Sequence, residues 1–310
     1  MTTTDILSTE TTSPTGASVL FYSPDYICRG YHIDTKEKAA DVIAALESTP
    51  IAGVVVVAPD PVTREQLVAV HDPRYVRGVL DGRPEEWAIR NGLGEWSPGL
   101  RDSVLASTGG AVASALHSFV HRTNSGSASS GLHHSGRARG AGFCTFNGLV
   151  IAAREVLARG AKRVLILDLD AHCGGGTASL IEDLAGVEQV DVAVNGYDSY
   201  TDTVNSTLLM SMGDTYLEDV AQALASVVDP STIDLVIYNA GMDPHERCRT
   251  GGERGITTAV LARRERMVFD WARGHGVPVS YVFAGGYANK NLDRAEVADL
   301  HLLTVAEAAR

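Results

Sequence analysis

The chain has 310 residues, of which 45% are hydrophobic and 21% charged, so it suits one large α/β domain or two small ones with a sizeable core. Its formal net charge of −12 argues against a protein that binds nucleic acid or an anionic membrane, because such binding depends on clustered lysine and arginine. A neutral or cationic small substrate suits this charge better.

The first seventeen residues are rich in threonine and serine, and we expect them to form a flexible tail before a single domain at residues 18–310. They lack the basic and apolar regions of a secretory signal. No stretch approaches the roughly 20 apolar residues of a membrane span, so we expect a cytoplasmic protein. The four scattered cysteines form no CxxC pair and indicate reduced thiols.

Strands are predicted at apolar, β-branched runs that alternate with longer helical patterns. The strand runs are 18–23, 53–59, 163–172, 190–196, 234–241 and 277–287. The helical patterns are 35–48, 63–82, 100–120, 146–160, 215–229 and 257–276. Continuous apolar strands indicate burial on both faces. The predicted fold is therefore α/β, a single open, mostly parallel sheet with helices on both faces in three αβα layers.

The segment 123–131, TNSGSASSG, has low complexity and contains residues that break helices. We predict a mobile surface loop there rather than a domain boundary, because the sequence HHSGRARGAGF follows almost directly.

Polar side chains gather at four predicted strand ends, where ligand sites of open parallel sheets lie. An isolated buried charge is costly, so these groups need a hydrogen bond, an ion pair or a metal. In chain order they are His133 and His134; Asp168, Asp170 and His172; Asp243; and Tyr287.

The stretch DLDAH places Asp168, Asp170 and His172 on one side of an extended strand, because residues two apart project the same way. With Asp243 added, they offer a set of two carboxylates and one imidazole, and three protein ligands with an open position are typical of catalytic zinc sites. Oxygen-rich ligation also suits Fe(II) or Mn(II). Each acid taken singly is more often a helix cap, but capping does not explain why all of them follow strands.

These motifs resemble the zinc-dependent histone deacetylase family of the arginase/deacetylase fold, including its bacterial histone deacetylase-like amidohydrolases. The resemblance covers most of the chain and rests on REQLVAVHDPRYVRGVLDG, LHHSGRARGAGFCTFN, VLILDLDAHCGGGT, IYNAGMDPHE and VSYVFAGGYA. It implies the fold of that family and hydrolysis of an N-acyl, chiefly N-acetyl, amide on a lysine-like or polyamine-like amine.

The resemblance also implies a role for each polar residue. Asp170, His172 and Asp243 match the metal ligands, for Zn²⁺ or alternatively Fe²⁺. Asp168 matches the acid that orients His133 and lines a monovalent-cation (K⁺) site. The remaining catalytic positions are the electrostatic imidazole His133, the general base His134, which deprotonates the attacking water, and the oxyanion donor Tyr287.

A narrow tunnel for an unbranched acyl-amine is implied as well. Phe143 matches one aromatic wall, with Gly142 beside it, and Gly286 is assigned to the substrate site next to Tyr287. Tyr197 or Tyr200 is expected to form the opposite wall.

The run HCGGG departs from the family pattern. Cys173 stands where the family has a second histidine, and Gly175 stands where it has the acid that pairs with the second tandem histidine. We therefore expect His134 to lack a carboxylate partner and catalysis to be slow. Ala193 replaces the serine of the K⁺ site, which argues against K⁺ binding.

Three functions stay open at this point. The first is a metal-dependent deacylase acting on an acetylated amine or acetyl-lysine, and the second is a catalytically weak or inactive relative that binds a ligand or partner. An arginase-like ureohydrolase ranks last, because it needs an acid where Gly174 stands. Acyl length and oligomeric state, including a homo-oligomer, are left open.

Overall fold

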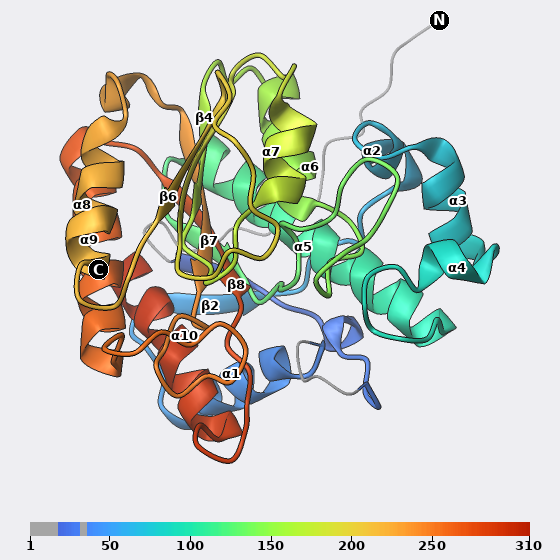
Figure 1. Ribbon diagram of the computed structural model, residues 1–310, viewed down its shortest axis with the longest axis horizontal. Helices are drawn as coiled ribbons and strands as arrows, with labels where there is room; N and C mark the ends of the chain where they lie inside the picture. Colours follow the sequence, from blue (N-terminus) through green and yellow to red (C-terminus); the bar gives the residue numbers. More distant parts are fainter. Residues whose placement is uncertain (1–17, 32–35) are drawn as a thin grey trace, which may run out of the picture.

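The computed structural model describes residues 18–31 and 36–310, so the predicted tail at 1–17 lies outside the described residues. Eight strands form one sheet in which every pairing is parallel, in the order β2-β1-β3-β8-β7-β4-β5-β6 (Figure 1). The strands are β1 Ser18–Phe21, β2 Val54–Val57, β3 Ser125–Ser127, β4 Val164–Asp168, β5 Val187–Ala193, β6 Ser206–Met210, β7 Leu235–Gly241 and β8 Val279–Ala284.

Helices cover both faces of this sheet. They are α1 Lys38–Ser48, α2 Arg64–Val68, α3 Pro73–Asp81, α4 Glu85–Ala88, α5 Pro98–His121, α6 Gly148–Ala158, α7 Gly175–Ile181, α8 Tyr216–Ser226, α9 Thr258–His275 and α10 Arg294–Ala308. Alternate residues of β4 belong to two different cores. Leu165 and Leu167 share a core with residues of α1, α8, α9 and α10, whereas Val164 and Ile166 share one with residues of α3, α5, α6 and α7. The predicted three-layer αβα fold is confirmed.

The helical pattern at 63–82 is interrupted. Thr63 caps α2 with a capping box that involves Gln66, whereas Asp72 accepts a hydrogen bond from the Arg74 N–H and Pro73 starts α3. Two short helices therefore replace the single one that the apolar period suggests. The helices α4, α7 and α10 were not predicted.

The segment predicted as a mobile surface loop contains β3, a fully buried central strand between β1 and β8, so that prediction is wrong. The hydroxyl of Ser125 is satisfied by serines of α5: it lies 3.2 Å from that of Ser114 and 2.7 Å from that of Ser118. Small side chains are required because a Cβ on Gly126 would lie 2.1 Å from the ring of Tyr281. Neither this strand nor the partly exposed edge strand β6 is a continuous apolar run, so the apolar pattern does not predict them.

Helix α5 is long and apolar enough to meet the criteria for a membrane span, although no such stretch was expected. In the fold, 67% of its apolar window is buried, and it packs on α6, β3 and β8. These are the surroundings of a core helix.

Replacing Gly126 by alanine tests the close packing at β3. The added methyl group would overlap the Tyr281 ring, so we expect Gly126→Ala to lower the free energy of unfolding by about 1–3 kcal/mol. Gly274→Ala is the control. Gly274 lies in α9, and a Cβ added there would have nothing within 4 Å, so alanine should be neutral or stabilising. Urea denaturation compares them. Equal stability of the two variants would contradict the packing described for β3.

Candidate active site

Four adjacent central strands bring the predicted polar residues to one edge of the sheet. In the order β3-β8-β7-β4, the segments after these strands carry His133 and His134, then Tyr287, then Asp243, then Asp170 and His172. Because the strands are parallel, their carboxyl ends lie at the same edge. Residues up to 154 positions apart therefore meet in one site.

Asp170, His172 and Asp243 form a buried group whose ligand atoms all lie within 4.8 Å of one another. Nδ1 of His172 is 3.1 Å from Oδ1 of Asp170 and 3.1 Å from Oδ2 of Asp243. That Asp243 oxygen is buried and accepts no hydrogen bond from any described residue. One imidazole nitrogen cannot satisfy two carboxylates, so this donor set fits a divalent cation.

The backbone next to Asp170 and Asp243 lies so close to them that there is no room for a side chain. A Cβ on Gly285 would lie 2.0 Å from Oδ1 of Asp243, and one on Gly241 would lie 2.4 Å from Cα of Asp170. Glycine at these two positions lets the ends of β7 and β8 approach the ligands.

A buried arginine ties the ends of two strands together behind the ligands. The Arg264 guanidinium donates hydrogen bonds to the carbonyl oxygens of Gly241 at 2.7 Å and Leu169 at 3.3 Å. Its charge is balanced by Glu265, at 2.6 Å. Arg264 therefore fixes the backbone between β4 and β7 without neutralising the ligand carboxylates.

His133 has a carboxylate behind it. Its Nδ1 donates to Oδ2 of Asp168 at 2.8 Å, and Oδ1 of Asp168 accepts hydrogen bonds from the Asn239 amide at 2.8 Å and the Asp170 N–H at 3.1 Å. Burial alone would lower the pKa of His133, but the carboxylates of Asp168 and Asp170 raise it to about 10. These two carboxylates therefore favour the protonated form of His133.

His134 also has a carboxylate partner, and the expectation that it lacks one is wrong. Its Nδ1 lies 2.9 Å from Oδ2 of Asp198, which comes from the segment after β5. Burial, followed by the charge of His133, lowers the pKa of His134 to about 4, so the ring is neutral. A carboxylate can only accept a hydrogen bond, so Nδ1 carries the proton and Nε2 has a free lone pair.

A second group of possible ligand atoms, on His133, His134 and Asp170, also lies within 4.8 Å. Here Nδ1 of each histidine is engaged with a carboxylate, that of Asp168 or Asp198. The charged His133 has no lone pair for a metal, so this group fits a cation less well.

Tyr287 lines the same cavity as His134 and His172. Burial, strengthened by the carboxylates of Asp243 and Asp170, raises the pKa of Tyr287 well above its usual value, so its hydroxyl stays a hydrogen-bond donor. The ammonium of Lys38 lies 5.6 Å from the centre of the Tyr287 ring and donates a hydrogen bond to the carbonyl oxygen of Gly285. The loop that carries Tyr287 is thus anchored from behind.

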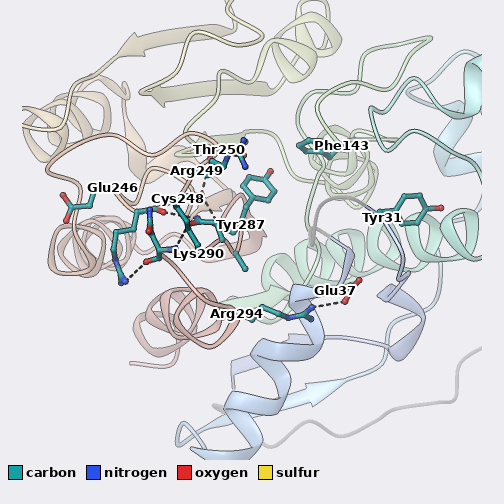
Figure 2. Close-up of a pocket in the computed structure, with 14 residues that line it drawn as sticks. Tyr31, Glu37, Phe143, Glu246, Cys248, Arg249, Thr250, Tyr287, Lys290 and Arg294 are labelled. Carbon is teal, nitrogen blue, oxygen red and sulfur yellow. Dashed lines mark hydrogen bonds and ion pairs between the residues drawn. The ribbon is translucent and has the colours of Figure 1, made fainter.

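A cavity of about 380 Å³ contains His134, His172 and Tyr287 in its wall, together with Gly142, Phe143 and Tyr197. Phe143 has a φ of 66°, rare for a bulky residue, and its ring centre is 6.1 Å from that of Tyr287. A larger cavity of about 1460 Å³ adjoins it and shares Phe143, Thr250 and Tyr287. Figure 2 shows Phe143 and Tyr287 among the residues that line this larger cavity.

Two residues assigned to the substrate site do not line the smaller cavity. Tyr200 donates a hydrogen bond to the carbonyl oxygen of Thr207 and accepts one from Gln189, so Tyr197 forms the wall instead. Gly286, with a φ of 74°, lies against Met242 and His301 and shapes the backbone before Tyr287.

Sequence reasoning missed Asn239, Asp198 and Arg264. Asn239 is a polar residue inside an apolar strand, which is a usable signal. Asp198 follows a predicted strand, which is a usable signal, and it lies between the two tyrosines Tyr197 and Tyr200. Arg264 has no local signal, because it lies in a helix with several other arginines.

Comparisons with known proteins identify the family of the chain. Residues 32–303 match the family described as "Histone deacetylase domain". An uncharacterized protein of Picosynechococcus sp. is 35% identical over 74% of this chain and 77% of its own length. A probable deacetylase of Methanothermobacter thermautotrophicus is 24% identical over 90% of this chain and 88% of its own length.

Among solved structures, the crystal structure of the HDA15 HD domain has the same fold, with a TM-score of 0.73, 21% identity, and coverage of 94% of this chain and 89% of that one. The family match covers most of the chain, including every residue of the site described above. The chain belongs to the histone deacetylase family.

Proposed function

We propose that this protein hydrolyses an N-acyl amide, chiefly N-acetyl, on an unbranched alkyl amine of the acetyl-lysine or acetylpolyamine type, with a divalent metal. One observation carries the proposal. The neutral His134, the ligand His172 and the hydroxyl donor Tyr287 face the same cavity of about 380 Å³. Base, metal ligand and oxyanion donor are thus within reach of one amide group.

Asp170, His172 and Asp243 would hold the cation, Zn²⁺ or Fe²⁺, which when bound polarises the amide carbonyl and acidifies water. The orphaned Asp243 oxygen supports this assignment. Oxygen-rich donor sets accept both metals.

His134 would act as general base. Its Nε2 lone pair takes the proton of the attacking water, and the same nitrogen then delivers a proton to the leaving amine. His133 stays charged, with ring centres of the two histidines 3.8 Å apart, and its positive charge stabilises negative charge that develops on the carbonyl oxygen. The two imidazoles thus have different protonation states and different tasks.

Tyr287 would donate its hydroxyl proton in a hydrogen bond to the carbonyl oxygen as that oxygen becomes an oxyanion. Phe143 and Tyr197 would enclose the alkyl chain and exclude water, because aromatic walls favour an apolar, unbranched substituent.

The two alternative functions have less support. The hypothesis of an inactive binding protein depended on His134 lacking an acid, and Asp198 supplies one. An arginase-like enzyme needs a second metal with its own acidic ligands, whereas the second candidate group here contains a charged His133.

Acetate release tests the proposal. The zinc-loaded or iron-loaded protein is incubated with a panel of acetyl-lysine peptides and acetylpolyamines, and we expect turnover of at least one class. His134→Ala should reduce kcat by about 10²–10⁴-fold because the base is lost. Full activity of His134→Ala, or no acetate release from any panel member by the wild type, would contradict the proposed function.

Tyr287→Phe removes only the hydroxyl group. We expect kcat to fall about 10²–10³-fold with little change in KM, because the lost hydrogen bond forms to the oxyanion rather than to the substrate. Steady-state kinetics and metal content are measured on the same sample. An unchanged kcat at unchanged metal content would remove Tyr287 from the oxyanion site.

Phe143→Ala widens the acyl tunnel. We expect kcat/KM for an acetylated linear amine to fall by about 10-fold or more, and the relative rate on a branched amine to rise. The ratio of kcat/KM for the two substrates is the readout. If that ratio stays constant, Phe143 does not select the substrate.

A further inference from the structure

The strongest unexplained feature is the segment 195–198, which follows β5 and reaches over to the segment after β4. Asn195 pairs with His172 as an isolated parallel bridge, and the Cys173 N–H donates to the carbonyl oxygen of Tyr197 at 3.0 Å. This segment, which we call the 195–198 turn, therefore lies directly beside the metal ligand His172.

Both departures in HCGGG face this turn. The buried Cys173 places its Sγ 3.4 Å from the carbonyl oxygen of Asn195 and 3.7 Å from the sulfur of Met210. An imidazole at this position would have to occupy space that the turn already fills. The small thiol permits the turn to pack closely.

Gly175, two residues after Cys173, is a second position at which a small residue lets the turn approach. A Cβ there would lie 2.3 Å from the backbone oxygen of Asp198, 2.9 Å from its Oδ1 and 3.0 Å from its Cγ. Gly175 does not have a positive φ, so the reason for glycine is space rather than backbone conformation. The carboxylate of Asp198 thus occupies the space into which an acidic side chain at position 175 would extend.

Asp198 is held in place by its surroundings. Its φ of 58° lies in the left-handed region, which aspartate tolerates better than most residues, and its Oδ2 accepts hydrogen bonds from Nδ1 of His134 at 2.9 Å and from the Gly176 N–H at 3.0 Å. The neighbouring Tyr197 places its ring centre 5.0 Å from that of His134.

We propose that Asp198 is the positioning residue for His134, and that Cys173 and Gly175 are small so that the 195–198 turn can deliver it. This inference rests on the proposed function, because it assigns the partner of its general base. One turn then supplies both the acid behind the base and, through Tyr197, a wall of the acyl tunnel. Substrate contact and base orientation belong to the same structural unit.

Kinetics of four variants and one control variant test the proposal. Asp198→Ala and Asp198→Asn should lower kcat at least about tenfold with metal content and KM near wild type, and Asp198→Glu should restore part of the loss. Gly175→Ala should reproduce the defect, because its methyl group displaces Asp198. Gly196→Ala is the matched control in the turn. A Cβ added at Gly196 would have nothing within 4 Å, and Gly196 has no positive φ, so this variant should behave as wild type.

A measurement without substrate separates this inference from the proposed function. In metal-loaded, ¹⁵N-histidine-labelled protein, the Nδ1–H proton of His134 should give a protected downfield resonance that Asp198→Ala and Gly175→Ala lose and Gly196→Ala keeps. If the wild type releases no acetate but the resonance follows this pattern, the contact stands and the proposed function fails. Wild-type kcat in Asp198→Ala, or a resonance that persists in it, would overturn the inference.

Discussion

Burial of negative charge at the carboxyl edge of the sheet is the constraint on which the site depends. Asp168, Asp170, Asp191 and Asp243 are all between 0 and 3% exposed. Burial of several carboxylates is tolerable only with positive charge or hydrogen-bond donors nearby. His133 forms an ion pair with Asp168. Burial and the nearby charge of Asp168 raise the pKa of Asp191 well above its usual value. Asp170 and Asp243 share a single imidazole, and a divalent cation would complete their balance.

The rest of the fold serves to hold this edge together. Arg264 joins the ends of β4 and β7 through backbone carbonyls, and its own charge is balanced by Glu265 rather than by Asp170 or Asp243. Glycines at the ends of β7 and β8 permit the close approach. Stability and function thus depend on the same few contacts behind the site.

Much of this could be predicted from the sequence, for identifiable reasons. The strands β4, β7 and β8 are continuous apolar runs, and the two-residue spacing of Asp168, Asp170 and His172 places them on one side of an extended chain. Parallel topology then places Asp243 and Tyr287 nearby. By contrast, β3 has a serine and glycine sequence that is typical of a loop, and its burial depends on hydroxyl pairing with α5, which no local pattern reveals.

The partner of His134 could not be predicted by aligning positions one by one. Gly175 signals a missing acid, but the replacement comes from Asp198, 64 positions after His134, through a turn whose path depends on tertiary packing. The same limit explains why Tyr197 and Tyr200 could not be told apart and why Gly286 was assigned to the cavity. Spacing identifies which strand end a residue follows, whereas side-chain direction there is decided by the neighbouring strands.

We propose that one divalent cation at Asp170, His172 and Asp243 is required for amide hydrolysis. The most direct measurement is acetate release from an acetylated alkyl amine by chelator-treated protein as Zn²⁺ or Fe²⁺ is added back in known amounts. We expect no turnover without metal and full recovery at one bound ion per chain. Turnover by the metal-free protein, or recovery only at two bound ions per chain, would contradict it.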